Sequence, residues 1–159
     1  MNTEKLTRIA LLSCLSIICG YIESLFPIIT SIPGIKLGIS NAIILFALYR
    51  LDKTSAFFIM LVKVLVSSML FSGFSVFIYS FAGGILSFLA MCILKKLQFS
   101  VVTVSMLGAV CHNIGQLFAA SVMLKRFSVF YYLPVLLISG LILGFLTGIL
   151  CKTLIFRIK

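Results

Sequence analysis

The chain has 159 residues, of which 62% are hydrophobic and 10% are charged, and its formal net charge is +10 at pH 7. A soluble domain of this length cannot hide so much apolar surface, so the composition indicates an integral membrane protein. The apolar excess runs along the whole sequence, which predicts one membrane domain over residues 1–159. Because the basic residues are spread between apolar segments, they indicate loops at a lipid bilayer and do not favour a nucleic-acid partner.

Six apolar segments follow one another along the chain, at residues 6–26, 37–51, 54–71, 75–94, 101–124 and 129–156. A helix that crosses a bilayer needs about 20 apolar residues. We therefore predict an all-α bundle of six transmembrane helices, a multi-pass protein of the cell membrane. A cleaved signal peptide is the alternative for the first segment, but no small-x-small cleavage site precedes Pro27. Residues 27–34 hold two prolines and could form a surface loop or a re-entrant turn.

The basic residues set the predicted orientation. With the N-terminus inside, nine of them fall at cytoplasmic ends, three fall at outer ends, and Lys63 lies within the third segment. The positive-inside rule then predicts that both termini are cytoplasmic. The nine are Lys5, Arg8, Arg50, Lys53, Lys95, Lys96, Lys152, Arg157 and Lys159, and the three are Lys36, Lys125 and Arg126.

Polar side chains inside the apolar segments are the best guide to function, because they are costly in lipid and usually line a protein interior or an aqueous cavity. The clearest group is residues 111–116, Cys-His-Asn-Ile-Gly-Gln, which contains the only histidine. Ordered by helical rise, the polar residues extend from the outer rim to the midplane, which predicts a cavity open to the outside and closed inside. The predicted substrate-binding residues are Glu23, Lys36, Asn41, Lys63, His112, Asn113 and Gln116.

Each of these residues also has a structural alternative. Glu23 and Lys36 could pair at the rim, and the two asparagines could satisfy broken backbone near the prolines. His112 and Gln116, which lie one helical turn apart, could tie helices together, at about 0.6 kcal/mol per hydrogen bond. Lys63 could extend to a surface, but its depth favours a buried partner. If the predicted residues line one cavity, its lysine, histidine and amide side chains are suited to bind a carboxylate, a phosphate or a heteroaromatic ring.

Small residues in the last segment predict a contact with another helix. Gly140, Gly144 and Gly148 recur at four-residue spacing. Such a stripe allows a close approach by another helix, either of this chain or of a partner subunit.

The residue types exclude several functions. There is no GxxxxGK[ST] phosphate loop, so this chain is not itself an ATP-driven pump. Its only acidic residues are Glu4, Glu23 and Asp52. Prenyl diphosphate chemistry needs clustered carboxylates to hold magnesium, and Ser/His/Asp or metal-hydrolase schemes fail for the same shortage. The five cysteines form no CxxC pair and indicate packing. We predict no enzyme activity, no metal site and no cofactor.

Two stretches resemble a known family. Residues 32–41, Ile-Pro-Gly-Ile-Lys-Leu-Gly-Ile-Ser-Asn, resemble the Pro-Gly-x-Lys-Leu-Gly-x-x-Asn signature of the Gx transporter family, and residues 108–116, Gly-Ala-Val-Cys-His-Asn-Ile-Gly-Gln, resemble its second signature. Members are often labelled heptaprenyl diphosphate synthase component I and are similar to the six-helix substrate-binding (S) components of energy-coupling factor transporters. The resemblance also marks Pro33, Gly34, Lys36, Asn41, His112, Asn113 and Gln116.

The resemblance implies a subunit that captures a small nutrient or precursor, with energy supplied by a separate transmembrane coupling protein and ATPases. The alternative is a non-catalytic membrane accessory of heptaprenyl diphosphate or quinone synthesis, which would bind a soluble synthase at its basic cytoplasmic face. A third hypothesis is a structural scaffold in a membrane redox complex. The sequence leaves the ligand open between a vitamin-like and an isoprenoid-related molecule.

Overall fold

The computed structural model describes residues 3–25, 38–71 and 73–157. These residues form six α-helices and one short 3-10 helix, five of the membrane segments being long and apolar enough to cross a bilayer. The predicted all-α membrane bundle of six helices is therefore confirmed. The elements are α1 (Thr3–Leu25), α2 (Ile39–Arg50), α3 (Lys53–Phe71), α4 (Gly73–Lys96), α5 (Val101–Leu124), η1 (Phe127–Tyr132) and α6 (Leu133–Arg157).

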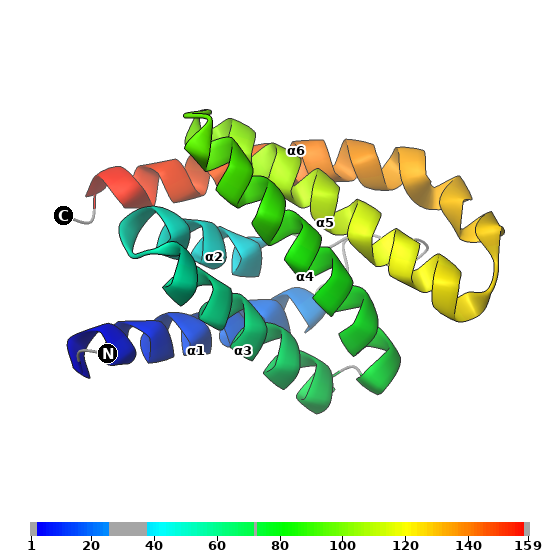
Figure 1. Cartoon of the computed structure of the whole chain (residues 1–159), viewed down its shortest axis with the longest axis horizontal. Helices are drawn as coiled ribbons and strands as arrows, with labels where there is room; N and C mark the ends of the chain where they lie inside the picture. The colour runs from blue at the N-terminus through cyan, green and yellow to red at the C-terminus, as the bar shows by residue number, and fades with distance from the viewer. Residues whose placement is uncertain (1–2, 26–37, 72, 158–159) are drawn as a thin grey trace.

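The helices form two groups of three. Contacts join α2 to both α1 and α3, and α5 to both α4 and α6, while α3 against α4 and α2 against α6 connect the groups. The N- and C-termini lie at the same end of the bundle as the turn between α2 and α3, and the connection between α5 and α6 lies at the opposite end (Figure 1). This arrangement is compatible with two termini on one side of a membrane, and their cytoplasmic location stays a prediction.

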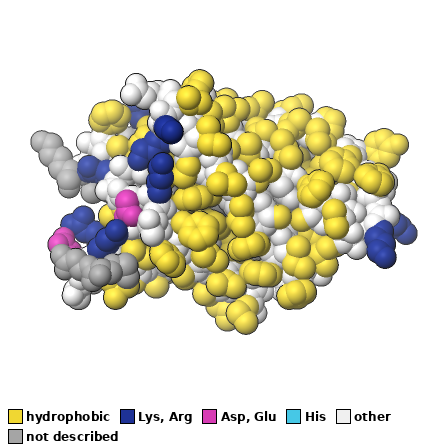
Figure 2. All heavy atoms as spheres, in the orientation of Figure 1, with side chains coloured by type: hydrophobic (Ala, Val, Ile, Leu, Met, Phe, Trp, Pro, Cys, Tyr) yellow, Lys and Arg dark blue, Asp and Glu magenta, His cyan; other side chains and the backbone are white. Residues whose placement is uncertain are grey.

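The surface of the bundle is apolar and its interior holds many hydroxyl groups. Figure 2 shows hydrophobic side chains over the middle of the visible face, with Lys and Arg gathered at the end that carries the termini and in a smaller group at the other end. Phe74 and Met69 are 76% and 84% exposed, although both are strongly apolar. This distribution fits a bundle surrounded by lipid. The buried polar residues are Ser13, Ser16, Glu23, Ser40, Ser55, Ser68, Ser87, Ser105, Ser121 and Thr147.

Helix α2 is too short to cross a bilayer. Its 12 residues span about 18 Å, against about 30 Å of hydrocarbon. A Cβ placed on Gly38, just before α2, would lie 3.9 Å from Cγ2 of Thr147, and Thr147 is about 15 Å from the end of α6 by helical rise. The second helix therefore begins deep inside the bundle, and its described start at Ile39 lies two residues after the predicted start of the segment. Lys36 and residues 27–34 lie outside the described residues.

The last helix begins later than predicted, because the residues from Phe127 to Tyr132 form η1 before α6 starts. Pro134 falls in the first turn of α6, where a missing backbone N–H is tolerated. The glycine stripe of α6 packs against α5: a Cβ on Gly144 would lie 2.7 Å from Cα of Met106, and one on Gly148 would lie 2.9 Å from Cα of Val102. The stripe therefore serves packing within this chain.

Candidate functional site

A polar cavity of about 100 Å³ lies within the bundle, and all six helices contribute to its wall. The sequence pattern placed seven residues in such a cavity, and the structure brings six of them to its wall. The seventh, Lys36, lies outside the described residues. Contact with a ligand remains a prediction for all seven. The six lining residues are Glu23, Asn41, Lys63, His112, Asn113 and Gln116.

Lys63 of α3 and Asn41 of α2 meet in the wall of this cavity. Nζ of Lys63 donates a hydrogen bond to Oδ1 of Asn41 over 2.9 Å. The lysine therefore has a partner inside the bundle, as its depth in the third segment predicted. The deep start of α2 puts Asn41 at the same level of the bundle as Lys63.

Glu23 of α1 holds the beginning of α2. Its side chain is buried, and Oε1 accepts a hydrogen bond from the backbone N–H of Ser40 over 3.1 Å. In return, Oγ of Ser16 donates to the carbonyl of Ser40 over 3.0 Å. The first N–H groups of a helix lack intrahelical partners and carry partial positive charge, so a carboxylate there is stabilising. Glu23 thereby fixes the turn that presents Asn41 to the cavity.

His112 and Gln116 lie one turn apart on α5, where this helix crosses α4. A Cβ placed on Gly83 of α4 would lie 2.7 Å from both Cγ of Gln116 and the carbonyl oxygen of His112. A Cβ on Gly115 would in turn lie 2.8 Å from Cα of Gly83. The crossing therefore needs glycine on both helices, and it fixes the position of the histidine turn. Sequence reasoning missed Gly83, although the Gly83-Gly84 pair inside an apolar segment was a usable signal.

Asn113 connects α5 to α6. Its Nδ2 donates to the carbonyl of Leu136 over 2.7 Å, and this carbonyl also accepts from Oγ of Ser139 over 3.1 Å. A Cβ on Gly140 would lie 3.0 Å from the same Nδ2. The side-chain amide of Asn113 thus donates to the backbone of α6. Asn113 therefore contributes to the packing of α5 against α6.

Hydroxyl groups form much of the cavity wall, and sequence reasoning did not single them out. Nine of the described lining residues carry a hydroxyl and seven are apolar, with no Phe or Tyr among them. Oγ of Ser67 is buried and has no hydrogen-bond partner among the described residues. The surface inside the bundle is therefore suited to hydrogen-bonding molecules. The nine are Ser24, Ser40, Ser67, Ser68, Ser80, Ser87, Ser105, Ser139 and Thr147.

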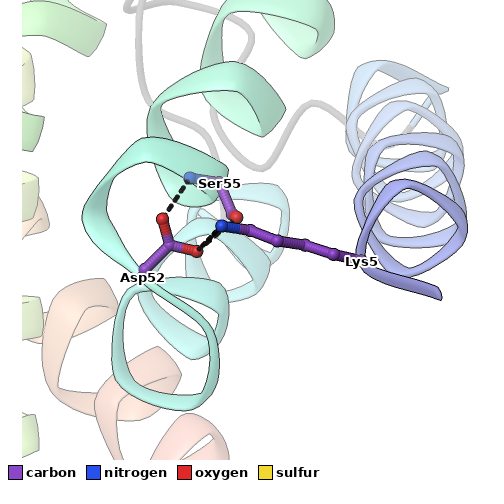
Figure 3. Close-up of polar contacts among 3 residues, drawn as sticks. All are labelled: Lys5, Asp52 and Ser55. Carbon is purple, nitrogen blue, oxygen red and sulfur yellow. Dashed lines mark hydrogen bonds and ion pairs between the residues drawn. The ribbon is translucent and has the colours of Figure 1, made fainter. Parts of the chain in front are cut away.

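The single aspartate lies away from the cavity, at the end of the bundle that carries the termini. Asp52 accepts hydrogen bonds from the hydroxyl and the backbone N–H of Ser55 at the start of α3, and its Oδ1 lies 3.0 Å from Nζ of Lys5 on α1 (Figure 3). The hydrogen bond from Ser55 and then the contact with Lys5 lower the pKa of Asp52 below its ordinary value of 3.8. This carboxylate caps a helix and anchors α1.

A model of the protein family described as heptaprenyl diphosphate synthase component I matches residues 12–154. No curated protein and no solved structure matches the chain.

Proposed function

The chain belongs to the heptaprenyl diphosphate synthase component I family, and within that family we propose that it is a membrane-embedded substrate-binding subunit of a multi-component transporter. It captures a small nutrient or precursor from outside the cell membrane. A separate transmembrane coupling protein and ATPases supply the energy, because this chain has no phosphate-binding loop of its own. In this role the protein is not an enzyme.

The cavity is the observation that carries this proposal. Charged and amide side chains from four helices line one space inside a bundle whose outer surface is apolar. Polar groups at membrane depth are expensive, and their convergence on a cavity is typical of a solute-binding site.

Binding of the co-purified ligand tests the proposal. Native mass spectrometry of gently solubilised protein identifies the bound molecule, and its affinity is then measured for Lys63→Ala and His112→Ala. We expect each variant to weaken binding by at least about tenfold, because each removes a charged or strongly polar contact. Lys96→Ala is the matched control, since Lys96 is an exposed lysine that does not line the cavity. Unchanged affinity in both cavity variants would contradict the assignment.

A non-catalytic accessory role in heptaprenyl diphosphate synthesis is the second candidate, and the family description favours it. The only aspartate of the chain caps α3, so a magnesium-dependent active site would have to come from a partner. A soluble synthase would bind at the basic end of the bundle, through residues such as Arg50, Lys53 and Lys96. Co-purification distinguishes the candidates: an associated ATPase supports the transporter, whereas a synthase without an ATPase supports the accessory.

A further inference from the structure

We propose that the connection between α5 and α6 binds an anionic phospholipid at the membrane surface. In this site Lys125 and Arg126 hold the headgroup, and the rings of Phe127 and Tyr131 lie beside it in the interfacial layer of the bilayer. None of these four residues lines the cavity, so this role goes beyond the proposed function and is independent of it.

The depth of this connection places it at the surface of a bilayer. α5 has 24 residues and α6 has 25, so each helix is roughly 36–38 Å long, against about 30 Å of hydrocarbon. η1 joins the two helices at the end of the bundle opposite the termini (Figure 1). It therefore lies in the headgroup layer, where amphipathic aromatic side chains concentrate.

η1 has one face packed on the bundle and one face open. Val129 and Phe130 pack against the apolar cluster between α5 and α6. Phe127 and Tyr131 are each 86% exposed. Two such rings would be costly in water, and the lipid beneath the headgroups removes this cost. A soluble anionic partner would account for the charges of this surface but not for the membrane depth of its rings.

The end of α5 fixes the two basic residues that precede these rings. Lys125 has a left-handed backbone with φ 51°. Its N–H donates to the carbonyl of Val122, and the N–H of Arg126 donates to the carbonyl of Ser121. This pattern is a common way to close the end of a helix. It holds the two basic residues in sequence directly before η1, and both side chains are exposed.

The charge of this basic pair is not neutralised by an acidic side chain of the protein. The sequence has three acidic residues, and all three are described. Glu4 and Asp52 form ion pairs at the end of the bundle that carries the termini. Glu23 is buried and caps α2. An anionic headgroup supplies the opposite charge, and each basic residue near an anionic membrane strengthens binding by about fivefold.

A single tryptophan tests this assignment, because the chain contains none. The full-length Tyr131→Trp protein is reconstituted in vesicles of phosphatidylglycerol and phosphatidylcholine in equal amounts, with brominated acyl chains on one lipid or the other. Bromine quenches tryptophan fluorescence on contact, so the two quenching levels give the relative occupancy of the site by each lipid. We expect phosphatidylglycerol to be favoured by at least about fivefold. Because exposed charges are screened by salt, the preference should shrink as the salt concentration rises.

Phe74→Trp is the matched control. Phe74 is 76% exposed at the start of α4, at the same end of the bundle (Figure 1), and residues 64–94 contain no basic residue. Both brominated lipids should quench this variant equally. Adding Lys125→Gln and Arg126→Gln to the Tyr131→Trp protein should abolish the preference for phosphatidylglycerol. Quenching itself should persist, because the ring at position 131 stays in the interfacial layer.

The proposal is overturned if the two brominated lipids quench Tyr131→Trp equally, or if the preference survives in the protein that carries both glutamine substitutions. Fluorescence typical of tryptophan in water, with quenching by neither lipid, also overturns it and would assign this surface to another partner. None of these outcomes depends on a ligand in the cavity or on an associated ATPase.

Discussion

Nζ of Lys63 and Oδ1 of Asn41 lie 2.9 Å apart in a hydrogen bond between α3 and α2. The two residues are 22 positions apart in the sequence, and only the deep start of α2 brings them together. Lys63 thereby has a hydrogen-bond partner inside the bundle, where a lysine side chain is costly without one. The bond also joins the capped first turn of α2 to the cavity wall.

Replacing one partner should cost more than replacing both. Asn41→Leu should lower the free energy of unfolding by roughly 1–3 kcal/mol, because it removes the acceptor of a partly buried charged donor. The double variant with Lys63→Met should recover part of this loss, with a coupling energy of about 0.5–3 kcal/mol. Denaturant titrations of the wild type, both single variants and the double variant give the cycle. Losses that add within about 0.5 kcal/mol would show that the two side chains do not interact.

Removal of the Glu23 carboxylate should release the start of α2. We expect Glu23→Ala to destabilise the protein by roughly 1–3 kcal/mol, because the N–H of Ser40 is left buried without its acceptor. Glu23→Gln retains an acceptor oxygen and should cost less. Thermal unfolding in detergent measures both. Glu4→Gln serves as the control, since it breaks an exposed ion pair with Arg8 that is worth about 0.5 kcal/mol or less. Equal effects at the two glutamates would contradict the capping role.

Two adjacent glycines should respond differently to alanine. Gly83→Ala places a Cβ 2.7 Å from the carbonyl oxygen of His112, which is backbone and cannot move away. We expect a loss of roughly 1–3 kcal/mol, the usual cost of overpacking. Gly84→Ala meets Sδ of Met60 at 3.0 Å, and this flexible side chain can adjust. Its effect should be smaller, because alanine also favours the helix. Similar unfolding midpoints for the two variants would show that the α4–α5 crossing is looser than described.

The Asp52 cap predicts an acid-dependent stability difference. The pKa of Asp52 is lowered in the folded state from 3.8, so its contribution is complete above about pH 4 and is lost as the pH falls through the folded pKa. Asp52→Asn should therefore be less stable than the wild type near neutral pH, and the two should converge below about pH 4. The side chain is 40% exposed, so the difference should be well under about 1 kcal/mol.

Melting temperatures of both proteins between about pH 3 and pH 7 test this expectation. Lys5→Met is the matched variant, because it removes the hydrogen bond and charge of Lys5 but leaves the hydrogen bonds from Ser55 that also lower the pKa of Asp52. It should give a smaller difference with the same sign. A gap between Asp52→Asn and the wild type that widens on acidification would contradict the cap.

Much of the fold could be predicted because lipid acts on each helix separately. Apolar length alone located the six segments, and the start and end of α5 at Val101 and Leu124 agree with the predicted 101–124. The segment around α2 was harder. Its apolar residues continue to Leu37, so periodicity and length could not show that the described helix begins at Ile39 and deep in the bundle.

The residues of the site were easier to predict than their contacts. His112 and Gln116 are polar in an apolar segment, so their position in an interior cavity follows from the cost of exposing them to lipid. Ser67 and Gly83 carry no such cost, because small residues are tolerated anywhere in a membrane helix. Their importance depends on which helix lies opposite, and that information is absent from any single segment.

By itself, then, the sequence determined that this protein is a membrane bundle of six helices with polar residues directed inward, because the free energy of burying each side chain in lipid is a local property. Only the tertiary structure decided that Glu23 caps α2, that Asn41 meets Lys63, and that Gly83 sets the position of His112. These contacts join residues from different helices, and they depend on where a short helix stops and how closely two backbones approach.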